Sequence, residues 1–129
     1  NGLYLVDEPA AISKKVMRAV TDAGPTQPNS PVSEPVNNLF TLMSVVSEPD
    51  TLAHFKAAYS DCSIRYGDLQ TQLAEDIIRF TDPIREKIKS ISSDEAYLRK
   101  VVAMGKEKAH ESAAKTVREV REIIGFRSF

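Results

Sequence analysis

The apolar residues of this chain recur at every third or fourth position, the spacing that places side chains on one face of an α-helix. The longest stretch begins at Tyr66 and predicts a continuous core stripe: Leu69, Leu73, Ile77, Phe80, Ile84, Ile88 and Ile91. Pro83 lies within it and is expected to kink the helix rather than end it, because the apolar spacing continues beyond it. No segment alternates convincingly between apolar and polar residues, so the sequence predicts an all-α fold.

Three shorter helices are expected before this one. The first starts at Asp7-Glu8-Pro9, with Asp7 as its cap, and ends at Gly24-Pro25. Its inward face is predicted to carry Ile12, Val16 and Val20. A proline-rich loop over residues 25–35 then leads to a short buried helix over residues 36–46. The next helix starts at Glu48-Pro49 in the same way as the first, and its inner face is expected to comprise Leu52, Phe55, Ala58 and Tyr59.

A last helix of about thirty residues is expected after Ser92-Ser93-Asp94, with Gly125 as its C-terminal cap. Its apolar stripe is predicted to comprise Leu98, Val101, Val102, Gly105, Ala109, Ala113, Thr116, Val117, Val120, Ile123 and Ile124. The whole pattern predicts a helical bundle of about five to six helices.

Composition limits the class of protein. A length of 129 residues allows one domain with a real core. The single Cys62 excludes an internal disulfide and a zinc site built on cysteines, and it favours a reducing compartment such as the cytosol. No apolar run is long enough to span a membrane. The chain begins with Asn1 rather than methionine, so we expect a piece of a longer protein.

The net charge of −1 is unevenly distributed. Residues 99–129 hold 8 basic and 4 acidic side chains, a net charge of +4, whereas the remaining 98 residues have a net charge of −5. A basic end suggests an anionic partner, although charged residues on a helix are more often a solvated face.

No catalytic or metal-binding pattern is present, because His54, His110 and Cys62 lie far apart in sequence and no phosphate-binding glycine loop occurs. Two basic groups are candidate nucleic-acid contacts: Lys14, Lys15 and Arg18 on the first helix, and Lys108, Lys115, Arg118 and Arg121 on the last. The second group has a structural alternative, since Glu111, Glu119 and Glu122 lie four residues from Lys115 or Arg118 and can form ion pairs along the helix.

The order of several segments is more specific than any one of them. These are LVDEP at 5–9, ISKKVMRAVTD at 12–22, VNNLF at 36–40, YGDLQTQLAE at 66–75, PIRE at 83–86, GKEKA at 105–109 and KTVREVR at 115–121. Together they resemble the C-terminal portion of bacterial-type tryptophanyl-tRNA synthetase, a class I family, from just beyond its K-M-S-K-S signature to the chain end. The similarity covers nearly all of the chain. The loop over residues 25–35 departs from the shorter or charged connection expected in that family.

This resemblance implies that a full-length parent activates tryptophan with ATP and Mg²⁺ and charges tRNA(Trp) in the cytoplasm as a homodimer. The ATP-binding signatures of the family belong to a Rossmann-type catalytic domain that these residues do not include. Residues 1–8 would then be the connector from that catalytic domain, and residues 9–129 the helical anticodon-binding domain. The fragment would need no cofactor and would be inactive alone. The alternative from a different class is a helical protein–protein interaction module without a nucleic-acid role.

Overall fold

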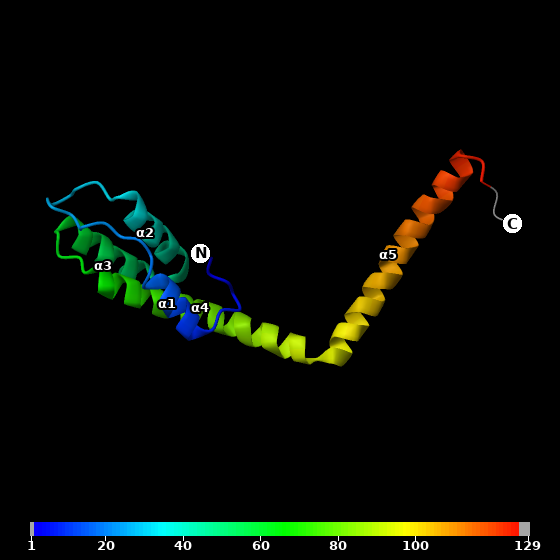
Figure 1. Cartoon of the computed structure of the whole chain (residues 1–129), viewed down its shortest axis with the longest axis horizontal. Coiled ribbons are helices and arrows are strands. Elements are labelled where there is room, and N and C mark those ends of the chain that lie inside the picture. The colour runs from blue at the N-terminus through cyan, green and yellow to red at the C-terminus, as the bar shows by residue number, and fades with distance from the viewer. Residues whose placement is uncertain (1, 127–129) are drawn as a thin grey trace. The chain divides into compact units, whose positions relative to one another are not determined.

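The computed structural model describes residues 2–126 and contains five helices in this part of the chain (Figure 1). They are α1 (Pro9–Val16), α2 (Glu34–Val46), α3 (Pro49–Ser60), α4 (Tyr66–Ser93) and α5 (Glu95–Ile123). No strand occurs among the described residues, so the predicted all-α class is confirmed. None of these helices is long and apolar enough to cross a membrane. The chain divides between Lys87 and Ile88 into two compact units, and each is described by itself.

The first three helices begin with proline in the first turn, and for α1 and α3 the sequence predicts this start. Helix α2 begins at Glu34, two residues before the predicted start, so Pro35 lies in its first turn and not in the preceding loop. Proline is favoured there because its fixed φ suits a helix and its missing N–H would have no helical partner. The prediction that Asp7 caps α1 is wrong. The N-cap residue is Glu8, and no side chain caps the helix, because the Asp7 carboxylate binds Lys15 and the Tyr4 amide instead.

Helix α1 is also shorter than expected. It ends at Val16, and Val20, predicted to face inward, is 72% exposed. The chain leaves the helix after Val16 because the residues that follow form hydrogen bonds with the N-terminal end of α4. There Gln70 Nε2 donates a hydrogen bond of 3.0 Å to the Ala19 carbonyl, and the Tyr66 hydroxyl donates to Asp22.

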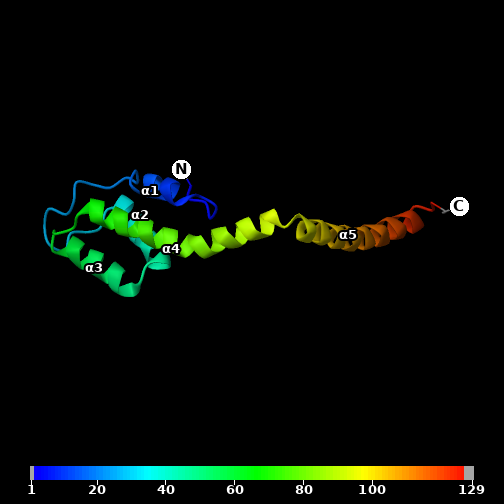
Figure 2. The same cartoon turned by 90° about the horizontal axis from the view of Figure 1, so that it is seen from below.

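The core of the first unit is formed by all four of its helices. Figure 2 shows α1 and α3 on different sides of the first half of α4. The buried apolar residues are Ile12, Val16, Val36, Leu39, Phe40, Met43, Phe55, Tyr59, Leu69, Leu73, Ala74 and Ile77. The expected proline-rich loop packs on α3, since the Tyr59 hydroxyl donates to the Pro31 carbonyl at 3.2 Å. The amide of Asn29 also donates to the Ser60 carbonyl at 2.8 Å.

Helix α4 continues through Pro83, as the apolar spacing predicts. Its stripe is not a continuous core, however. The apolar core cluster ends at Ile77, and Phe80 and Ile91 are exposed. The reason is that the core residues of α1, α2 and α3 pack against the N-terminal half of this helix alone.

Helix α5 has defined ends but no buried residue. The Asp94 carboxylate accepts a hydrogen bond of 2.9 Å from the Tyr97 amide, which caps its N-terminus. At the other end the predicted Gly125 cap is confirmed. Gly125 has a φ of +77°, and the amide of Phe126 donates to the Arg121 carbonyl at 2.8 Å. The apolar stripe of α5 therefore exists as predicted, but nothing in its own unit covers it.

Candidate nucleic-acid interface

The three basic candidates on and after α1 differ in their surroundings. Lys14 is exposed, and so is Arg18, which follows the end of the helix. Neither takes part in an ion pair with another residue in the described part of the chain. Arg18 lines a hollow of about 430 Å³ whose other walls are mainly apolar, among them Leu3, Leu42 and Leu73. Lys14 and Arg18 are therefore available to an anionic ligand.

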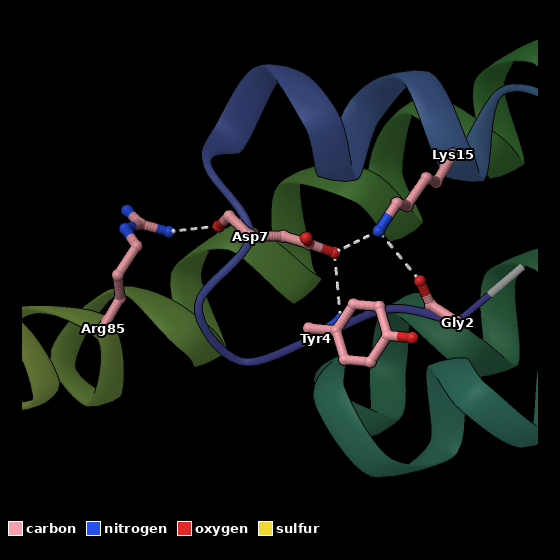
Figure 3. A network of polar contacts seen from close by, with 5 residues as sticks. All are labelled: Gly2, Tyr4, Asp7, Lys15 and Arg85. Atoms are coloured by element: carbon pink, nitrogen blue, oxygen red, sulfur yellow. Dashed lines mark hydrogen bonds and ion pairs between the residues drawn. The ribbon is translucent and has the colours of Figure 1, made fainter.

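Lys15 is instead engaged in contacts within the protein (Figure 3). Its ammonium group lies 2.6 Å from Asp7 Oδ2, donates to the Gly2 carbonyl at 2.9 Å, and lies 4.9 Å from the centre of the Tyr4 ring. The Lys15 and Asp7 side chains are 37% and 16% exposed. Lys15 lowers the pKa of the Asp7 carboxyl, and the Tyr4 amide lowers it further.

Arg85 completes this network from α4, and its part in it was not predicted from the sequence. Its guanidinium donates to the Asp7 carbonyl at 3.2 Å and forms an ion pair with Asp82. Arg85 is 6% exposed. The sequence feature that could have indicated its burial is its spacing. Arg85 follows the buried Ile77 and Thr81 at intervals of four residues, so it falls on the same face of the helix.

A second, partly buried contact fixes the segment after α1. The Asp22 carboxylate accepts hydrogen bonds from the Tyr66 hydroxyl and, at 2.7 Å, from the Gly24 amide. The Ser33 and Tyr66 hydroxyls lower the pKa of Asp22. Burial and the Asp22 charge raise the pKa of Tyr66. Asp22 is therefore ionised and Tyr66 neutral at physiological pH, so the pair anchors the chain and offers no proton for transfer.

The structure brings Arg118 and Arg121 together near the C-terminal end of α5. With Phe126 and Val117 they line a hollow of about 800 Å³ beside the turn at Gly125. Lys115 forms a long ion pair of 4.0 Å with Glu119, one of the predicted pairs along the helix. Lys108 lies almost three turns before Arg118 and lines neither of these hollows.

The hollow at the end of α5 combines features that suit a single-stranded nucleic acid. Two guanidinium groups can hold phosphates, and Phe126 offers an exposed ring on which a base can stack. No group of three or more side chains that could hold a metal ion occurs among the described residues. Glu122 also lines the hollow and offsets part of its positive charge. The arrangement can bind an anionic, partly aromatic ligand.

The comparison with solved structures concerns the fold. The fold matches part of an aminoacyl-tRNA synthetase, a tryptophanyl-tRNA synthetase from Campylobacter jejuni solved with ADP and tryptophan. That likeness has a TM-score of 0.75 at 18% identity, and it covers 94% of this chain and 37% of the other. No protein-family model matches the chain.

The sequence comparisons find similar tryptophan–tRNA ligases. The chain is 58% identical over 127 residues to the tryptophan–tRNA ligase of Porphyromonas gingivalis, which covers 98% of this chain and 39% of that enzyme. It is 33% identical over 127 residues to the corresponding ligase of Mycobacterium leprae, covering 96% of this chain and 36% of the relative. The expected resemblance to the C-terminal portion of tryptophanyl-tRNA synthetase is therefore confirmed. The chain spans little more than a third of the length of these relatives.

Proposed function

We propose that the chain is the C-terminal helical portion of a tryptophan–tRNA ligase and that it binds the anticodon arm of tRNA(Trp). The observation that carries the proposal is the 58% identity to one such ligase over 98% of this chain. The full-length enzyme would activate tryptophan with ATP and Mg²⁺ and transfer it to the tRNA. No residue of this chain is assigned to ATP or Mg²⁺, which the catalytic portion would hold.

The chemistry at the end of α5 supports the RNA contact. An anticodon loop is single-stranded, so its bases can stack on aromatic rings and its phosphates can pair with arginine. Arg118, Arg121 and Phe126 provide both kinds of contact within one hollow. Lys14 and Arg18 offer further phosphate contacts on the first unit.

The proposal also assigns the remaining partners. The chain would act joined to its own catalytic domain, and the full-length enzyme would be a cytoplasmic homodimer. The second candidate is a helical protein–protein interaction module, and the exposed apolar stripe of α5 favours it, because such a face can bind a partner helix.

Titration with tRNA(Trp) separates the two candidates. We expect the chain to bind weakly and with marked salt dependence, because only a few phosphates are neutralised. The double variant Arg118→Ala/Arg121→Ala should bind about tenfold more weakly and reduce the slope of log affinity against log salt by about two. Fluorescence anisotropy of a labelled tRNA at several salt concentrations measures both quantities.

A charge-matched control is the double variant Lys56→Ala/Arg65→Ala, which removes two exposed basic residues outside the candidate groups. It should bind tRNA like the unaltered chain. Equal losses in both double variants, or no tRNA affinity at low salt, would favour the interaction module. In the full-length enzyme, the Arg118/Arg121 variant should lose tRNA charging while pyrophosphate exchange stays nearly intact, and the chain alone should show no such exchange.

A further inference from the structure

Residues 2–7 form no helix, yet polar contacts hold them in one conformation against two helices (Figure 3). The Asp7 carboxylate accepts from the Lys15 ammonium of α1 and from the Tyr4 amide, at 2.6 Å and 2.9 Å. The Asp7 carbonyl accepts from Arg85 of α4 at 3.2 Å, and the Gly2 carbonyl accepts from Lys15 at 2.9 Å. The segment is thus bound through its backbone as well as its side chains.

Apolar packing holds this segment only in part. Leu3, Tyr4, Leu5 and Val6 are between 39% and 63% exposed. Hydrophobic stabilisation grows with the apolar area removed from water, so these half-exposed side chains provide only part of what they could provide if buried. The polar network supplies specific contacts that hold residues 2–7 in one conformation.

Lys15 differs from its neighbour Lys14 in its capacity for new contacts. An ammonium group has three donors, and Lys15 uses two of them on Asp7 and Gly2 while the Tyr4 ring lies close to the group. A phosphate would find a single remaining donor on Lys15, on an ammonium group whose charge is already paired with a carboxylate at 2.6 Å. Lys14 is exposed and would bind a phosphate without such a limit.

We propose that Lys15 is a positioning residue, which with Asp7 and Arg85 forms a latch that fixes residues 2–7 to α1 and α4, and that it does not contact RNA. It follows that residues 2–8 belong to the helical unit and are not a free connector. If the chain is part of a full-length ligase, as proposed above, a displacement of the preceding chain would reach α1 and α4 through this latch.

Hydrogen exchange in the 129-residue chain tests the latch. The Tyr4 and Asp7 amides report on it, since the first donates to the Asp7 carboxylate and the second to the Tyr4 carbonyl. In Lys15→Met these two amides should exchange about fivefold faster or more, because the segment opens more often. Lys15→Arg should restore most of the protection, since a guanidinium also donates to the carboxylate. Lys14→Met is the matched control and should leave both rates unchanged.

The core amides of α4 should keep their protection in every variant, which shows that the fold is retained. Asp7→Asn provides a second route to the open latch, and combined with Lys15→Met it should add little to either single change. If the Tyr4 and Asp7 amides exchange at the unaltered rate in Lys15→Met, the latch is refuted.

Titration of the same variants with tRNA separates the latch from an RNA contact. We expect Lys15→Met to retain the affinity of the unaltered chain within twofold. A loss of affinity with unchanged exchange would overturn the proposal. If both the exchange rates and the tRNA affinity change in Lys15→Met, the Asp7→Asn variant decides between the two roles, because it opens the latch without removing a positive charge. An equal loss of affinity in Asp7→Asn supports the latch. No loss of affinity in Asp7→Asn would show that Lys15 is an RNA contact. If no variant binds tRNA, the proposed function fails, and exchange alone decides the latch.

Discussion

At the scale of single residues, the ionisation of Asp7 is the most informative property of the first unit. Its carboxylate faces Lys15 from α1, Arg85 of α4 donates to its carbonyl, and Glu8 follows it in the chain. Hydrogen bonds from Lys15 and the Tyr4 amide lower the pKa of Asp7. A carboxyl whose pKa is lowered in the folded state stabilises that state above its unfolded pKa of about 3.9, and this contribution is lost as pH falls through the lowered pKa.

We therefore expect residues 2–7 to stay ordered at neutral pH and to detach when the pH falls below about 4. The Tyr4 amide chemical shift, followed by NMR from pH 6 to pH 2, should report the transition, and Asp7→Asn should abolish it. Asp61→Asn is a suitable control, because the pKa of Asp61 is lowered by Ser63 and that carboxylate bonds outside the segment. A transition that persists unchanged in Asp7→Asn would show that another group titrates.

The sequence could not show that Lys15 is engaged in contacts within the protein while Lys14 is exposed. Both lie in one basic run, and the difference comes from Asp7 and from the position of Arg85, 78 residues from Asp7 along the chain. Arg118 and Arg121 were found from the sequence because their relation is local: a spacing of three on one helix places them together near its end. None of the candidate RNA contacts has been tested, so they stay predictions.

At the scale of elements, the ends of helices were predictable where local chemistry sets them. Proline in the first turn located the starts of α1 and α3, and Asp94 and Gly125 located the ends of α5. The start of α2 was placed two residues too late, because Pro35 was assigned to the loop. The end of α1 was not predictable, because its departure at Val16 depends on contacts with Tyr66 and Gln70 of α4. Tertiary hydrogen bonds there outweigh the local apolar spacing that continues to Val20.

Gly105 and Gly125 allow a paired test of whether local backbone preference sets the end of α5. Among the described residues, an added Cβ at either position would meet no atom within 4 Å beyond the neighbouring residues and the helix backbone, so backbone preference separates the two positions. Gly125 has a φ of +77°, where alanine is strained by about 1 kcal/mol, so Gly125→Ala should destabilise the end of the helix. Gly105 lies inside the helix, where alanine is favoured by up to about 1 kcal/mol.

The same chemical change should thus have opposite effects at the two positions. Circular dichroism during thermal unfolding should show less helix in Gly125→Ala and more in Gly105→Ala than in the unaltered chain. Equal effects of the same sign would mean that the Gly125 turn does not set the end of α5. Gly125→Ala should also weaken tRNA binding, because the turn places Phe126 beside Arg121.

At the scale of the whole molecule, the two units differ in what stabilises them. The first buries twelve apolar residues from four helices. In the second, α5 buries none, so its helical state depends on intrinsic propensity, its caps and ion pairs such as Arg99–Glu95 at 3.0 Å. Such contributions are small, and even long isolated helices are only marginally stable in water. The sequence predicted the stripe on α5, but periodicity says only that a face is apolar and not which surface covers it.

The central amides of α5, around Ala109, should therefore exchange with solvent several hundredfold faster than those of α4 around Leu73, because local opening of α5 exposes no core. Mass spectrometry after deuterium labelling measures both regions in one experiment. Joining the chain to the catalytic portion of a ligase should slow exchange in α5 if that portion covers the apolar stripe, whereas tRNA alone should slow it mainly near Arg118 and Arg121. Equal protection of α5 and α4 in the isolated chain would contradict this account, since it would require a partner for the stripe, such as a second copy of the chain, which sedimentation velocity would detect.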